Sequence, residues 1–167
     1  NDYKIENFFV VPEPLIKKEF SRIMSLKDGL KKMSKSEVSD LSRINLTDDK
    51  DQIINKIKKA KTDTLPLPST IEELEKRPEA KNLIGIYSSL MNNTLQKSID
   101  EFAGKNFSEF KEKLSDVVVN EINPISLKIK ELLDDKVFLE KILKDGYEKA
   151  NEIASKKIKK IHEIVGF

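Results

Sequence analysis

The sequence predicts a mainly α fold, in which a helical bundle follows a short amino-terminal region of extended segments. Two patterns in its 167 residues support this prediction. From about residue 48 onward, apolar residues recur at spacings of three and four, the period of a helix with one buried face. Before that point, short β-prone runs alternate with proline and glycine turn formers. The length suits one complete core preceded by a piece of a second domain.

Three runs in the amino-terminal region have the composition of strands. They are residues 8–11, 22–26 and 43–46, and turn formers separate them. The chain starts with Asn1 and reaches the first run almost at once. We therefore expect the sequence to be part of a longer protein.

The first helix should cover about residues 48–61, with Thr47 as its N-cap. Its isoleucines share one face, and we expect its lysines on the opposite, solvated face. A proline-containing loop follows, with a helical turn near residues 71–74. Pro78 suits the first turn of the next helix, whose apolar residues repeat with the helical period.

Three further helices complete the predicted bundle. Thr94 caps a short helix that stops at Gly104. Asn106, with a glutamate three residues later, resembles a capping box that begins a long helix. The last helix should end at Gly166. Antiparallel helices that each bury one face form a small bundle, and we assign it to residues 47–167.

Composition excludes several classes of protein. The formal net charge is +2, far from the strong basicity of a protein that coats nucleic acid. Without cysteine, the chain has no disulfide, no thiolate metal site and no cysteine nucleophile, and we expect no metal site. No apolar run approaches the roughly 20 residues that span a bilayer. We therefore expect a soluble, cytoplasmic protein with no membrane partner.

Residues 30–36 read Leu-Lys-Lys-Met-Ser-Lys-Ser and concentrate cations and hydroxyls directly after Gly29. Lysine ammonium groups are compact charges on flexible stems, and serine hydroxyls donate to phosphate oxygens. A mobile loop of this kind can stabilise the negative charge of a departing pyrophosphate without exchanging protons. From composition alone, the alternative is a solvated basic turn.

The five residues 32–36, Lys-Met-Ser-Lys-Ser, resemble the signature loop of class I aminoacyl-tRNA synthetases. The surrounding segments are similar to the tryptophan-specific branch of these enzymes, namely residues 9–14, 22–26, 42–48, 61–63, 77–83 and 86–87. The tyrosine-specific branch is the related alternative, and only the family comparison disfavours it. One departure is that Glu37 and Val38 follow the loop, where many relatives have Asp-Pro. This departure concerns only the geometry of the loop's exit.

The resemblance implies the activity of a tryptophan–tRNA ligase. Residues 1–46 would hold the last strands and the signature loop of a Rossmann-type α/β catalytic domain, and residues 47–167 would form a helical anticodon-binding domain. The substrates would be tryptophan, ATP with Mg²⁺, and the tryptophan tRNA, and the full-length enzyme would be a homodimer. Because the rest of the family's active site lies upstream of this sequence, we expect this chain alone to be inactive and to hold no cofactor tightly.

The resemblance also assigns roles to single residues. Lys32 and Lys35 would contact the ATP phosphates and stabilise the leaving pyrophosphate. Ile23 matches a position that lines the adenine site, and a buried strand residue is its alternative interpretation. The ATP-binding residues implied in this way are Ile23, Lys32, Met33, Ser34, Lys35 and Ser36.

Contacts to tRNA are less specific. Lys149, Lys156 and Lys160 should share one face of the last helix, where they could approach RNA phosphates or simply keep the helix solvated. His162 has no evident partner for chemistry nearby in sequence, so we interpret it as a surface residue. A non-catalytic helical module that binds RNA or protein is the alternative to an enzyme.

Overall fold

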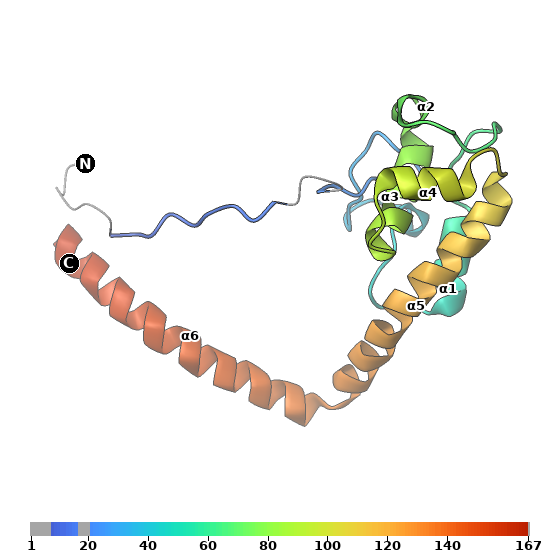
Figure 1. The fold of residues 1–167 in the computed structure, drawn as a ribbon. Coiled ribbons are helices and arrows are strands. Elements are labelled where there is room, and N and C mark those ends of the chain that lie inside the picture. Colours follow the sequence, from blue (N-terminus) through green and yellow to red (C-terminus); the bar gives the residue numbers. More distant parts are fainter. Residues whose placement is uncertain (1–7, 17–20, 167) are drawn as a thin grey trace. The chain divides into compact units, whose positions relative to one another are not determined.

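The structure is a computed structural model, and it describes residues 8–16 and 21–166. Its elements are a 3-10 helix, η1 (Asp40–Ser42), and the helices α1 (Lys50–Lys58), α2 (Ile71–Glu75), α3 (Pro78–Leu90), α4 (Leu95–Phe102), α5 (Phe107–Asp134) and α6 (Lys136–Val165) (Figure 1). The mainly α fold class is therefore confirmed.

The three predicted strands are not strands in the part of the chain that the structure describes. One isolated antiparallel bridge, between Met24 and Lys32, is the only pairing found there. Isolated runs cannot form a ladder, because a strand needs a neighbour of similar length to take up its backbone donors and acceptors. Residues 8–11 and 43–46 have no such neighbour among the described residues.

Capping residues set most helix starts and ends as predicted. The Thr94 hydroxyl accepts from the Lys97 amide, and the Asn106 side chain accepts from the Glu109 amide at 2.9 Å. Pro78 is the first residue of α3. Gly166 ends α6 with a φ of +88°, a left-handed conformation that glycine adopts without strain.

The predicted N-cap of the first helix was wrong. Asp49, rather than Thr47, caps α1. The Asp49 carboxylate accepts from the Gln52 amide at 2.9 Å, and the Gln52 side chain accepts from the Asp49 amide at 2.8 Å. This reciprocal capping box satisfies two backbone donors. Thr47 is followed three residues later by Lys50, which has no acceptor to return such a bond.

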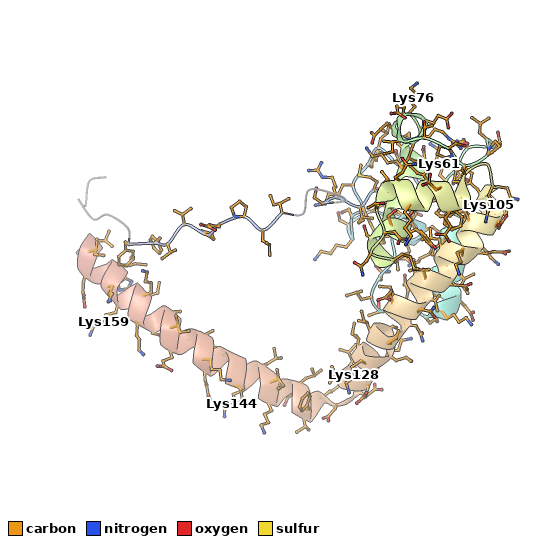
Figure 2. All side chains as sticks on the ribbon, in the orientation of Figure 1. Lys61, Lys76, Lys105, Lys128, Lys144 and Lys159 are labelled. Carbon is orange, nitrogen blue, oxygen red and sulfur yellow. The ribbon has the colours of Figure 1, made fainter. Side chains whose placement is uncertain are left out.

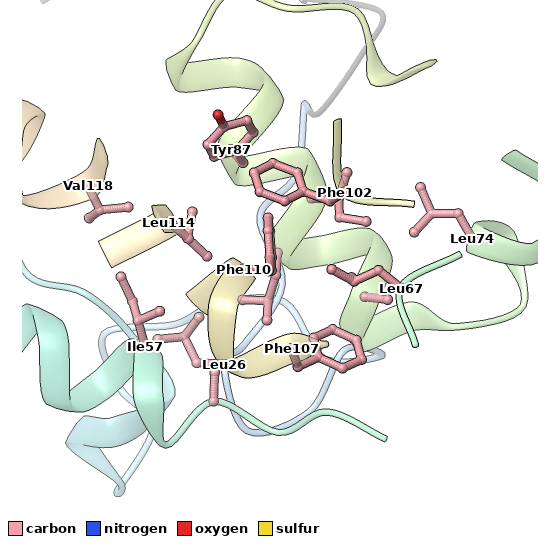
Figure 3. Packing of buried hydrophobic residues seen from close by; sticks show 14 of the residues in the cluster. Leu26, Ile57, Leu67, Leu74, Tyr87, Phe102, Phe107, Phe110, Leu114 and Val118 are labelled. Atoms are coloured by element: carbon pink, nitrogen blue, oxygen red, sulfur yellow. The ribbon is translucent and has the colours of Figure 1, made fainter. Parts of the chain in front are cut away.

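The described chain divides into two compact units, one of residues 16 and 21–130 and one of residues 8–15 and 131–166. In the first, apolar side chains from α1 to α4, the start of α5 and the connecting loops form the core (Figure 3). The rings of Tyr87, Phe102 and Phe110 pack edge to face at its centre, with centroids 4.9–6.0 Å apart. Burial, reinforced by a hydrogen bond to Glu101, raises the pKa of Tyr87 to about 12.

α6 departs from the prediction that every helix buries one face, because none of its described residues is buried. Leu143, Tyr147 and Ile153 are all more than 60% exposed. Among the described residues of its unit, residues 8–15 and the end of α5 accompany this helix of 30 residues, which is about 45 Å long. The Lys157 ammonium donates to the Phe8 carbonyl and lies 3.8 Å from the centroid of the Phe8 ring and 5.1 Å from that of the Phe9 ring.

Candidate functional site

The signature loop emerges from a short hairpin stem. The Met33 amide donates to the Ile23 carbonyl at 3.0 Å, and the Ser25 amide donates to the Lys31 carbonyl at 2.8 Å. These two bonds flank Met24 and Lys32, which therefore lie directly opposite each other as a non-hydrogen-bonded pair. The stem fixes the backbone of Lys32, where the loop begins.

Within the loop, Ser34 and Ser36 bond to each other. The hydroxyls of Ser34 and Ser36 are 2.9 Å apart, and the Ser36 amide donates to the Ser34 hydroxyl at 3.3 Å. A weak turn bond of 3.4 Å joins the Glu37 amide to the Ser34 carbonyl. The serine side chains thus bond to each other, and a ligand has to compete with these contacts to use them.

Lys32 and Lys35 are both exposed, and neither makes an ion pair or side-chain hydrogen bond with a described residue. Their neighbour Lys31 differs, because its ammonium lies 3.8 Å from the Asp28 carboxylate. Two uncompensated ammonium groups at one solvated turn can approach an anion without first breaking a protein contact.

Ile23 and Met33 form the inner side of the stem. Both are half-buried, and Met33 packs against the hydrophobic core. Their role at an adenine site stays a prediction, because half-burial suits both a packing residue and the wall of a binding site.

The stem rests on the first turns of α3. The Asn82 side chain accepts from the Met24 amide at 2.9 Å and donates to the Met24 carbonyl at 2.8 Å. The turn at Gly29 lies so close to α3 that a Cβ there would be 2.6 Å from backbone atoms of Pro78 and Glu79. Only glycine allows this approach without displacing the turn.

A polar cluster holds the segment that leaves the loop. Buried Lys56 lies 2.6 Å from both Asp40 and Asp48, and Asp48 also accepts from the Asn45 amide at 2.8 Å. Arg43 donates to the Glu37 carbonyl at 2.9 Å. The side-chain hydrogen bond from Lys56 is the main cause that lowers the pKa of Asp40.

Lys56 corrects the prediction that the lysines of the first helix lie on its solvated face. Its side chain is 3% exposed, and that of Asp48 is 5% exposed. A buried charge is tolerated when it is paired and hydrogen-bonded, and removing one partner costs about 3–5 kcal/mol. The pair therefore holds the segment after the loop against α1.

Arg77 holds the loop between α1 and α2. Its guanidinium donates twice to Asp63, at 2.8 and 2.5 Å, and once to the Pro66 carbonyl at 2.6 Å. This fork lowers the pKa of the Asp63 carboxyl, chiefly through its hydrogen bonds. Nearby, Lys61 pairs with Glu79 at 2.9 Å, which lowers the pKa of Glu79.

Sequence reasoning missed Asn82, Lys56 and Arg77 as supports of the site. A signal existed for the first two, since each is a polar residue within an apolar helical pattern. Such a residue is costly to bury unless it has a partner. The partner of Asn82 lies 58 positions away, and no local pattern specifies that pairing.

A cavity of about 670 Å³ lies apart from the signature loop, between residues 62–66 and the start of α5. Lys111 lines it and donates to the Ala60 carbonyl at 2.6 Å and to the Lys58 carbonyl at 3.3 Å. Burial lowers the pKa of Lys111. Its ammonium serves as a cap for the carboxyl end of α1, so it supports the fold.

The lysines predicted to meet tRNA lie exposed on α6, whose side chains Figure 2 shows. Lys149, Lys156 and Lys160 share one face by helical spacing. Lys156 pairs with Glu152 at 2.7 Å, which partly compensates its charge. His162 is exposed, as predicted.

The described residues contain no group of three or more histidine, cysteine or acidic side chains that could hold a metal ion. None of the helices described is both long and apolar enough to cross a membrane.

The mainly helical fold, with a Lys-Met-Ser-Lys-Ser turn on a supported stem, fits the class I aminoacyl-tRNA synthetases. The chain belongs to the family of class I tRNA synthetases for tryptophan and tyrosine. The model of this family matches residues 2–123.

The curated relatives that match this chain are tryptophan–tRNA ligases. The chain is 46% identical to a tryptophan–tRNA ligase of Brucella melitensis and 49% identical to one of Agrobacterium fabrum, each over 99% of this chain and 47% of the relative. A tryptophan–tRNA ligase of Rickettsia felis is 50% identical over 94% of this chain and 47% of the relative. The chain thus spans about half the length of the curated relatives it matches.

Solved structures agree in fold. A tryptophanyl-tRNA synthetase from Mycoplasma pneumoniae matches 90% of this chain and 45% of its own, with a TM-score of 0.73 and 24% identity. One from Campylobacter jejuni matches 96% of this chain and 48% of its own, with a TM-score of 0.63 and 25% identity.

Proposed function

We propose that this chain is part of a tryptophan–tRNA ligase and supplies its ATP-closing loop and its anticodon-binding domain. The observation that carries the proposal is the pair of exposed lysines, Lys32 and Lys35, which have no ion-pair partner among the described residues and lie on a loop whose two flanks are fixed by buried polar contacts. Identity of 46–50% to tryptophan–tRNA ligases supports the choice of substrate.

In this proposal the full-length enzyme converts tryptophan and ATP to tryptophanyl-adenylate and pyrophosphate, and then passes the tryptophanyl group to the tryptophan tRNA with release of AMP. Lys32 and Lys35 contact the phosphates and stabilise the charge that develops on the leaving pyrophosphate. Ser34 and Ser36 donate to phosphate oxygens, and Ile23 and Met33 contribute to the adenine site. Mg²⁺ enters with ATP, bound to its phosphates.

The proposal extends to the arrangement of the whole enzyme. Residues 1–46 belong to its Rossmann-type catalytic domain, and residues 47–167 form its helical anticodon-binding domain. The enzyme acts in the cytoplasm as a homodimer. This chain alone is inactive, because groups that stabilise a transition state together are strongly non-additive.

The test is tryptophan-dependent exchange of pyrophosphate into ATP, measured on this chain and on a longer protein extended toward the amino terminus to the length of its relatives. We expect exchange only in the longer protein, with tryptophan and not with tyrosine as substrate. Exchange by this chain alone would contradict its proposed inactivity. Absence of exchange in both would favour a non-catalytic RNA- or protein-binding module.

Binding of tRNA through α6 is tested separately. We expect Lys156→Glu with Lys160→Glu in the longer protein to weaken tRNA affinity and to reduce its dependence on salt, because fewer phosphates are neutralised. Lys144→Glu with Lys128→Glu, outside the proposed face, changes the net charge equally and serves as the control. Equal loss in both double variants would indicate a general charge effect and not a binding face.

A further inference from the structure

We infer that Asn82 is a positioning residue for the signature loop, acting on Lys32 through the backbone of Met24. The inference rests on the proposed function, in which Lys32 stabilises the leaving pyrophosphate. It adds a residue of α3, outside the loop, to the machinery that sets the rate.

Geometry gives the first argument. In an antiparallel pair of the non-hydrogen-bonded type, the amide and carbonyl of each residue point away from the residue opposite. Met24 and Lys32 form such a pair, so the polar backbone atoms of Met24 face away from the loop. Asn82 binds both of these atoms, at 2.9 and 2.8 Å.

The Asn82 amide thus takes the place that a neighbouring strand would occupy. A primary amide offers one donor and one acceptor in a plane, which is what the peptide group of a third strand would present. Neighbouring atoms of the segment are held as well, since Leu26 accepts from the Lys61 amide at 2.7 Å and donates to the Ser42 carbonyl at 2.9 Å. Asn82 provides the corresponding hydrogen bonds for the backbone of Met24.

Burial gives the second argument. Asn82 is 6% exposed. Its side-chain oxygen accepts from the Met24 amide, and its side-chain nitrogen donates to the Met24 carbonyl. An apolar residue of similar size would fill the same space but leave the Met24 backbone without partners. The stem could then shift in register or splay, and Lys32 with it. A displacement of about 1 Å in a catalytic group can lower a rate about 100-fold.

The test uses the longer protein and a double-mutant cycle. We expect Asn82→Leu to lower the turnover of tryptophan-dependent pyrophosphate exchange about 10- to 100-fold. In a Lys32→Ala background, Asn82→Leu should lower it less than about twofold further, because it acts through the same side chain. Ile84→Val, a destabilising change on the buried face of α3, should leave exchange unaltered.

Asn82→Asp gives a second variant if Asn82→Leu does not fold. It keeps the acceptor for the Met24 amide and loses the donor to the Met24 carbonyl, so we expect it too to slow exchange. If Lys32→Ala slows exchange while both Asn82 variants leave it unchanged, or if the effects of Asn82 and Lys32 simply multiply, the positioning role is refuted and the proposed function stands. If Lys32→Ala itself has no effect, the proposed function fails, and the inference fails with it.

Discussion

Two pairs of lysines in the larger unit differ in what surrounds them. Lys56 and Lys111 are buried, and each donates to several protein oxygens. Lys32 and Lys35 are exposed and have no such acceptor among the described residues. Lysine therefore supports the fold at the two buried positions and is available to bind an anion at the two exposed positions.

The largest effect on stability is expected at the buried pair of Lys56 and Asp48. Asp48→Ala removes one of two partners of Lys56, and we expect a loss of about 3 kcal/mol in the free energy of unfolding, because a buried charge loses compensation. Urea denaturation measures it. Asp51→Ala, an exposed acid in the first turn of α1, is the control and should cost about 0.5 kcal/mol. Equal effects of the two changes would show that the buried pair is not special.

A smaller effect is expected where the stem meets α3. Gly29→Ala places a Cβ 2.6 Å from the backbone of Pro78 and Glu79, which cannot rotate away, so we expect a loss of about 1–3 kcal/mol. Gly146→Ala in α6 is the matched control, because nothing lies within 4 Å of the added Cβ. It should stabilise the helix by up to about 1 kcal/mol. Opposite signs in thermal denaturation support the close approach, and equal signs would contradict it.

Acid should weaken the loop held by Arg77. The Arg77 guanidinium lowers the pKa of Asp63 in the folded state. The contact therefore stabilises the fold at pH values above 3.8, the ordinary pKa of an aspartate. This stabilisation is lost as the pH falls through the lowered folded pKa. We expect Asp63→Asn to reduce the fall in unfolding free energy between about pH 5 and pH 2. Parallel curves for the parent and the variant would exclude Asp63 as a contributor.

The fold could be predicted in large part from the sequence because helix boundaries depend on nearby residues. Thr94, Asn106 and Gly166 act within one turn of their own positions, and each prediction was confirmed. The misplaced N-cap at Thr47 was a local error, but the predictions of three strands and of a buried face on α6 failed because they depend on distant parts of the chain. A strand requires a partner, and the apolar face of α6 requires a surface to cover it, so neither follows from local composition.

In the candidate site too, the part formed by nearby residues was predicted and the part formed by distant residues was not. The Lys-Met-Ser-Lys-Ser turn was found from sequence because its residues are contiguous. Its supports were not found, since Asn82 meets Met24 across 58 positions and Lys56 reaches Asp40 across a turn and η1. Only the folded chain brings these groups together.

We expect Lys32 and Lys35 to act on substrate charge and not on stability. The most direct measurement compares Lys32→Ala, Lys35→Ala and the exposed control Lys27→Ala in the longer protein, by tryptophan-dependent pyrophosphate exchange and by urea denaturation. We predict that each loop variant lowers the exchange rate about 100- to 1,000-fold while the unfolding free energy changes by less than about 0.5 kcal/mol, and that Lys27→Ala changes neither. Unaltered exchange in both loop variants would contradict the claim, and so would a loss of stability large enough to explain the lower rate.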